Sequence, residues 1–94
     1  MADVHLPGTL TPLFDGLPRR LEIEAPTVAA ALDELETRWP GLWDRLCEPG
    51  PAIRRHIHVY VDRERAGLDT QLDVRSRVDV IAAISGGGGS VNDS

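Results

Sequence analysis

Apolar residues at alternate positions predict the strands of this chain. Residues 20–24 alternate in this way, with Leu21 and Ile23 facing inward, and a short apolar run precedes them at residues 4–6. We expect these two segments to form a hairpin. A third strand is predicted at residues 54–61, where Ile57, Val59 and Val61 share one face and the residues between them share the other. The apolar, β-branched run at residues 77–84 predicts the last strand.

A spacing of three to four residues predicts one main helix over residues 28–39. Its apolar stripe consists of Val28, Leu32, Leu35 and Trp39. Thr27 is a favourable N-cap after Pro26, and Pro40-Gly41 ends the helix. A short helical turn should follow and cover the core with Leu42, Trp43 and Leu46.

The remaining segments complete a small α+β domain. Residues 48–51 and 62–67 are rich in turn-forming or polar residues and are predicted to be loops, and residues 68–72 predict a short edge strand. The expected order is strand, strand, helix, strand, short strand, strand. A mixed sheet of four to five strands packed on one main helix accommodates this order.

Four consecutive glycines, Gly86 to Gly89, follow the last strand almost directly. Glycine has no Cβ and wide backbone freedom, so this segment should be flexible and thin enough to enter a channel that excludes side chains. We therefore expect a folded domain at residues 1–85 and a flexible tail at residues 86–94.

Composition and charge exclude several classes of protein. The net charge of −5 argues against nucleic acid as a partner. No apolar run approaches the roughly 20 residues that a membrane-spanning helix needs, and residues 1–7 do not resemble a signal peptide. These features favour the cytoplasm. All ten basic residues are arginine, which reflects either a biased genome or a protein whose activated tail must not acylate its own amines.

The candidate catalytic and metal-binding residues do not form a convincing centre. His56 and His58 share one strand face, but zinc needs three or four ligands, so we expect no metal site. The carboxylates of the main helix, Asp33, Glu34 and Glu36, are typical of a solvated face. Cys47 is the only cysteine and has no resolving partner, so it is expected to be packed and inert. We predict a carrier or binding protein without a bound cofactor, not an enzyme.

Four stretches together resemble the ubiquitin-like sulfur carriers of the ThiS/MoaD family over nearly all of residues 3–87. These stretches are the helix from Thr27 to Leu42, the segment from Leu46 to Asp62, the turn and strand from Leu72 to Val80, and the ending Ile81-Ala82-Ala83-Ile84-Ser85-Gly86-Gly87. The resemblance implies a β-grasp fold in which the first and last strands lie parallel at the centre of the sheet. Asp73-Val74-Arg75-Ser76-Arg77 departs from the Asp-Gly-Asp turn that is usual in the family.

The resemblance also implies a chemistry for the tail. In the family, an adenylyltransferase of the ubiquitin-activating type uses ATP to adenylate a terminal glycine, and a sulfur donor then converts it to a thiocarboxylate. Here that residue would be Gly87, or alternatively Gly89, and Gly86 and Gly87 would enter the site of a sulfur-accepting biosynthetic enzyme. Residues 88–94 would first have to be removed, for example by a JAMM-type metalloprotease, unless they are an added linker.

Two other functions remain open from the sequence. The chain could be the small subunit of molybdopterin synthase, or a ubiquitin-like interaction module whose tail is never activated. In each case the sheet face not covered by the helix is available to a partner. We place partner docking at Arg55, His56, His58 and Tyr60, because arginine and aromatic residues suit interfaces, although the same pattern is also that of a solvated face.

Overall fold

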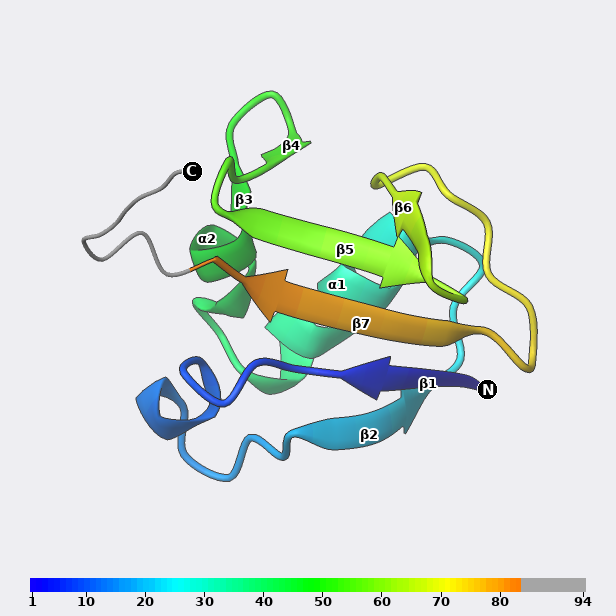
Figure 1. Ribbon diagram of the computed structural model, residues 1–94. Helices are drawn as coiled ribbons and strands as arrows, with labels where there is room; N and C mark the ends of the chain where they lie inside the picture. Colours follow the sequence, from blue (N-terminus) through cyan, green and yellow to red (C-terminus); the bar gives the residue numbers. More distant parts are fainter. Residues whose placement is uncertain (84–94) are drawn as a thin grey trace.

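The computed structural model describes residues 1–83, and residues 84–94 lie outside the described part. A five-stranded sheet has the order β2-β1-β7-β5-β6 (Figure 1). Its strands are β1 (Ala2–His5), β2 (Arg20–Ile23), β5 (Ile57–Val61), β6 (Glu64–Ala66) and β7 (Arg77–Ala82). The helices are α1 (Val28–Arg38) and α2 (Leu42–Leu46), with a 3₁₀ turn at Thr11–Leu13. A separate hairpin joins β3 (Cys47–Glu48) to β4 (Ala52–Ile53).

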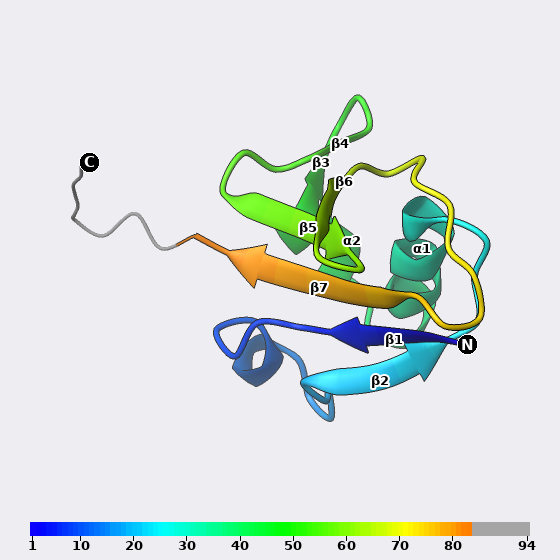
Figure 2. The same ribbon diagram turned by 45° about the vertical axis from the view of Figure 1, so that its right-hand side comes forward.

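The first and last strands run parallel at the centre of the sheet, as the resemblance implied. Val4 of β1 pairs with Val78 of β7, while β2 pairs with β1 and β5 pairs with β7, both antiparallel. Both strands point toward the same end of the molecule, and the N-terminus lies at the other end (Figure 2). The strands predicted at residues 4–6, 20–24, 54–61 and 77–84 are present, except that β1 begins two residues earlier than expected, β5 begins at Ile57 and β7 ends at Ala82.

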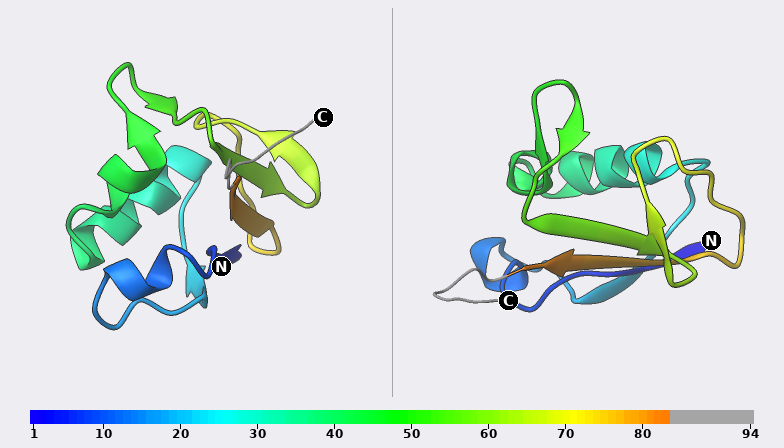
Figure 3. Two further views of the ribbon diagram at one scale, coloured as in Figure 1. Left: turned by 60° about the vertical axis from the view of Figure 1, so that its left-hand side comes forward. Right: turned by 45° about the horizontal axis from the view of Figure 1, so that its top comes forward.

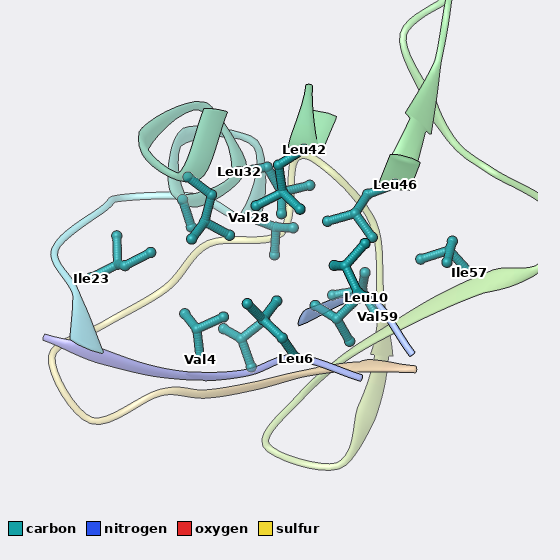
Figure 4. Close-up of a cluster of buried hydrophobic side chains, with 14 of the residues drawn as sticks. Val4, Leu6, Leu10, Ile23, Val28, Leu32, Leu42, Leu46, Ile57 and Val59 are labelled. Atoms are coloured by element: carbon teal, nitrogen blue, oxygen red, sulfur yellow. The ribbon is translucent and has the colours of Figure 1, made fainter. Parts of the chain in front are cut away.

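Helices α1 and α2 cover one face of the sheet and leave the other face open (Figure 3). Thr27 caps α1 as predicted, since its hydroxyl oxygen accepts a hydrogen bond from the amide of Ala30 at 3.2 Å. Figure 4 shows the apolar core between the two layers. Val28, Leu35 and Leu42 are fully buried there. The sheet and its main helix therefore form one two-layer domain.

The predicted loop at residues 62–67 was wrong, because Glu64–Ala66 forms the edge strand β6. Asp62 and Arg63 have φ values of 51° and 73°, which make a tight two-residue connection between β5 and β6. Such a connection usually carries asparagine or glycine, so this pair gave a weak turn signal. The edge strand therefore lies several residues earlier in the chain than the edge strand predicted at residues 68–72.

The predicted edge strand at residues 68–72 was also wrong, because this segment lies across the start of α1. The carbonyl oxygens of Leu68 and Thr70 accept hydrogen bonds from the amides of Ala29 and Val28, at 2.8 and 3.0 Å. The first amides of a helix have no partner within the helix. Residues 68–72 therefore satisfy helix donors instead of extending the sheet.

The turn before β7 is closed without the glycine that is usual in the family. The amide of Ser76 donates to the carbonyl oxygen of Asp73 at 3.2 Å. The carboxylate of Asp73 accepts from the amide of Arg75 at 2.8 Å, and the buried hydroxyl oxygen of Ser76 accepts from the amide of Asp73 at 2.9 Å. Side chains of Asp73 and Ser76 thus hold the turn that starts the central strand.

Glu36 is half-buried and connects the two helices, so assigning it to a solvated face was wrong. Its carboxylate accepts hydrogen bonds from the amide of Gly41 at 3.0 Å and from the amide of Trp43 at 2.8 Å. These two hydrogen bonds hold the pKa of Glu36 below its usual value. The ionised carboxylate therefore stabilises the start of α2.

We expect Glu36→Gln to lower the melting temperature at neutral pH more than at acidic pH. Because the folded-state pKa of Glu36 is depressed, its contribution is complete above the unfolded-state pKa of about 4.3 and is lost as the pH falls through the folded-state value. Thermal unfolding followed by circular dichroism between pH 3 and pH 8 measures the difference. Asp33→Asn on the exposed surface of α1 is the control, and an equal loss in both variants at every pH would contradict the capping role.

Candidate functional site

The end of β7 positions the segment that carries the predicted reactive glycines. β7 is hydrogen-bonded to β1 along one edge and to β5 along the other. Beyond the strand, the amide of Ala83 donates to the carbonyl oxygen of His56 at 2.8 Å. Hydrogen bonds therefore fix the backbone as far as Ala83, three residues before Gly86. Ala83 follows the end of β7 that lies opposite the N-terminus (Figure 1). The predicted tail residues Gly86, Gly87 and Gly89 lie outside the described residues.

The open sheet face presents aromatic, apolar and imidazole side chains near this end. Register places His58 opposite Ile81, and Tyr60 opposite Asp79. Ile81 is 47% exposed, whereas its neighbour Val80 is buried on the helix side. An exposed isoleucine on a central strand is a contact that another protein can bury.

Charged side chains form a network on β1 and β2 of the same open face. The Asp3 carboxylate accepts from Nε of Arg20 at 3.0 Å and lies 3.1 Å from Nε2 of His5. The hydrogen bond from Arg20, supplemented by that with His5, holds the pKa of Asp3 below its usual value. Arg77 and Asp79 on β7 form a further ion pair at 3.0 Å. Charged pairs therefore border His58, Tyr60 and Ile81.

The structure separates the four residues that the sequence assigned to partner docking. His58 and Tyr60 lie half-buried on the open face. His56 is exposed just before β5 and holds Ala83 through its carbonyl group. Arg55 is exposed beside the β3–β4 hairpin and lines a cavity there with Ile57 and Val59, whose side chains face the core. The predicted set thus spans two surfaces that meet near His56.

Sequence reasoning did not name Ile81 as a docking residue. The period-two alternation of β7 could have found it, because Val78 and Val80 on one face require Ile81 on the other. A continuous apolar run from Val80 to Ile84 obscured this alternation. Ile81 is therefore added to the candidate surface.

The other chemically reactive side chains of residues 1–83 are not arranged for catalysis. Cys47 is 1% exposed, and its burial raises the pKa of the thiol to about 11, which keeps it protonated and unreactive. Within residues 1–83, no group of three or more histidine, cysteine, aspartate or glutamate side chains is placed to hold a metal ion. None of the helices in this part of the chain is both long enough and apolar enough to cross a membrane.

The comparison with protein families agrees with this architecture. The model of the ThiS family matches residues 4–87, which covers the domain from Val4 onward and ends at the second glycine of the tail. The chain belongs to the ThiS family. This ThiS-family protein is accordingly a ubiquitin-like sulfur carrier and not an enzyme.

Solved structures confirm the β-grasp fold of the ThiS-family protein. A chain of the Amycolatopsis orientalis BexX/CysO complex is 26% identical with a TM-score of 0.82, and the match covers 93% of our chain and 100% of that chain. CysO of Mycobacterium tuberculosis is 24% identical with a TM-score of 0.78, over 89% of our chain and 100% of CysO. SAMP1 of Haloferax volcanii is 25% identical with a TM-score of 0.72, over 92% and 98% of the two chains. No curated protein sequence matches the chain.

Proposed function

We propose that Gly87, once it is the terminal residue, is adenylated and converted to a thiocarboxylate that delivers sulfur to a biosynthetic enzyme. The observation that carries the proposal is the extent of the family match, which ends at Gly87. The position of β7 supports it, since the strand is paired on both edges and its next residue is held by His56. The domain that we assign to residues 1–85 would thus present a narrow tail, residues 86–94 before trimming.

The reaction requires an electrophile that a carboxylate alone does not provide. A carboxylate oxygen of terminal Gly87 attacks the α-phosphorus of ATP on an adenylyltransferase of the ubiquitin-activating type, and pyrophosphate leaves. Sulfide attacks the carbonyl carbon of the acyl adenylate, and AMP leaves. Where the sulfur donor is a protein persulfide, the attack gives an acyl disulfide, and a thiol cleaves it and is itself oxidised to a disulfide with the donor. The product is a thiocarboxylate. ATP is a substrate of the partner, and its use favours a cytoplasmic location.

Glycine at the end of the tail suits delivery into another protein. Gly86 and Gly87 have no Cβ, so they fit a channel in which any side chain would clash. The complex of BexX with CysO in Amycolatopsis orientalis supports the expectation that a related carrier assembles with a partner protein. Removal of residues 88–94 by a JAMM-type metalloprotease would expose Gly87.

We place the docking of the activating partner on the open sheet face, at His58, Tyr60 and Ile81, with His56 at the base of the tail. These residues lie on β5 and β7 or beside them, so a partner that binds them also lies next to Ala83. Aromatic and apolar groups bordered by charged pairs are typical of a protein interface.

Intact-protein mass spectrometry tests the proposed function. The form that ends at Gly87 is incubated with the adenylyltransferase from the same genome, ATP and sulfide. We expect its mass to increase by the difference between sulfur and oxygen, and to remain unchanged without ATP. A form that ends at Ser85 is the control. If the Gly87 form stays unmodified while it binds the adenylyltransferase, the chain is an interaction module and the proposal is wrong.

A further inference from the structure

A cavity of about 680 Å³ lies between the β3–β4 hairpin and the edge strand β6. Both β4 and β6 lie on the side of β5 that faces away from β7 (Figure 1). We call this cavity the arginine groove. Its lining includes Ile53, Arg54, Arg55, Arg65, Ala66 and Leu68. In the β5–β6 pairing, Ala66 lies opposite Val59 and so faces the same side as the groove, whereas Arg65 lies opposite Tyr60 and places the rim of the groove next to the open face.

The arginine groove combines an apolar interior with a cationic border. Ile57 and Val59 are buried beneath it, and Ile53, Ala66 and Leu68 are half-buried in its walls. Arg54, Arg55 and Arg65 surround these groups, and Asp69 is the carboxylate among the lining residues. This concentration of positive charge stands out in a chain whose net charge is −5.

The guanidinium groups of Arg55 and Arg65 are available to a ligand. Within residues 1–83, Arg55 and Arg65 form no ion pair, whereas Arg20, Arg38 and Arg77 each pair with a carboxylate. Nε of Arg54 donates to the carbonyl oxygen of Asp44 at 2.7 Å, which fixes the direction of this side chain. An arginine without an intramolecular partner binds carboxylates well because its planar group donates two parallel hydrogen bonds.

Two short edge strands border the groove. Among residues 1–83, β4 pairs with β3 alone and β6 pairs with β5 alone, so each strand has an edge without a neighbour in this part of the chain. An extended peptide can align with such an edge and place alternate side chains into adjacent pockets. Apolar side chains of that peptide would meet Ile53, Ala66 and Leu68, while acidic side chains would meet Arg55 and Arg65.

We propose that the arginine groove binds an extended acidic segment of a protein partner, in which acidic and aliphatic residues alternate. The alternative polyanion, a single-stranded nucleic acid, is disfavoured because no aromatic side chain of residues 1–83 lines the groove for base stacking and the chain is acidic overall. The proposal goes beyond the sulfur chemistry and does not depend on it. Because Arg55 is next to His56, a partner that holds the tail can also reach the groove.

Nuclear magnetic resonance of the full ¹⁵N-labelled chain tests the proposal. The probes are a synthetic hexapeptide of alternating Glu and Val, and a matched hexapeptide of alternating Lys and Val. We expect the acidic peptide to shift the amide signals of Ile53, Arg55, Ala66 and Leu68, and the basic peptide to leave them unchanged. Added salt should weaken the binding. Absent groove shifts, or equal shifts with both peptides, would overturn the proposal, as would the same groove shifts with oligouridylate.

Charge-reversal variants identify the side chains responsible. Arg65→Glu should weaken binding of the acidic peptide roughly tenfold, because an attraction becomes a repulsion. Arg75→Glu, an exposed residue of the turn before β7, makes the same change in net charge outside the groove and should bind as the unmodified chain does. An equal loss of affinity for the acidic peptide in both variants would show that only the net charge matters. That result would overturn the assignment of Arg65 to the binding site. If Arg65→Glu perturbs signals throughout the domain, Arg65→Gln replaces it in the same comparison.

Discussion

Truncation after Gly87 is expected to switch on ATP–pyrophosphate exchange by the cognate adenylyltransferase, at a rate at least about a hundredfold above that of the full-length chain. In the full-length chain, the terminal carboxylate of Ser94 follows Val91, Asn92 and Asp93. Their side chains would clash in a channel shaped for glycine, and Asp93 adds a negative charge beside the group that must approach ATP. Exchange of radiolabelled pyrophosphate into ATP measures the difference directly.

A truncation after Gly89 determines whether the position of the terminal carboxylate matters. This form ends in glycine but is two residues longer than the form that ends at Gly87. Slow exchange by the Gly89 form would show that the adenylyltransferase requires the terminal carboxylate at a fixed distance from the domain. The absence of side chains from the end of the tail would then not be sufficient. Exchange by the full-length chain as rapid as that of the Gly87 form would show that trimming is unnecessary, and the proposed maturation would then be rejected.

Ile81→Asp should raise the KM of the adenylyltransferase for the Gly87 form by about tenfold or more, with little change in kcat. Ile81 is 47% exposed and lies opposite His58 on the open face, so the substitution places a charge where we expect a partner to bury an apolar group. The tail that carries the reacting carboxylate is unchanged. An increase in KM without a change in kcat is therefore expected for a residue that contributes to docking only.

Val74→Asp provides the matched control for Ile81→Asp. Val74 is 72% exposed in the turn before β7, close to the N-terminal amine, which donates to its carbonyl oxygen at 3.1 Å. This end of the domain is opposite the C-terminal end of β7 (Figure 1). We expect Val74→Asp to leave KM unchanged and Tyr60→Ala to raise it. If Ile81→Asp and Tyr60→Ala both retain the original KM while circular dichroism shows a folded domain, the docking surface lies elsewhere.

The main helix and most of the sheet could be predicted because their signals are local. The Thr27 cap and the apolar stripe of Val28, Leu32 and Leu35 specify α1 without reference to distant residues. Alternation likewise specifies β2 and β5. The resemblance carried by four stretches of residues 3–87 implied parallel central strands and a protein of the ThiS family, and both are confirmed.

Contacts between distant segments decided the rest. Residues 68–72 look like a strand, but the amides at the start of α1 need acceptors, and the carbonyl groups of Leu68 and Thr70 supply them. Glu36 looks like a solvated residue until Gly41 and Trp43 bring their amides to its carboxylate.

The two candidate surfaces also depend on tertiary structure. Arg55 precedes β5 and lines the arginine groove, whereas Tyr60 lies within β5 on the open face, opposite Arg65 of β6. The sequence by itself determined the main helix, most of the strands and the glycines that follow the last strand. Only the tertiary structure decided which polar groups satisfy one another, and hence which of them remain available to a partner, because hydrogen bonding between remote segments has no periodic pattern along the chain.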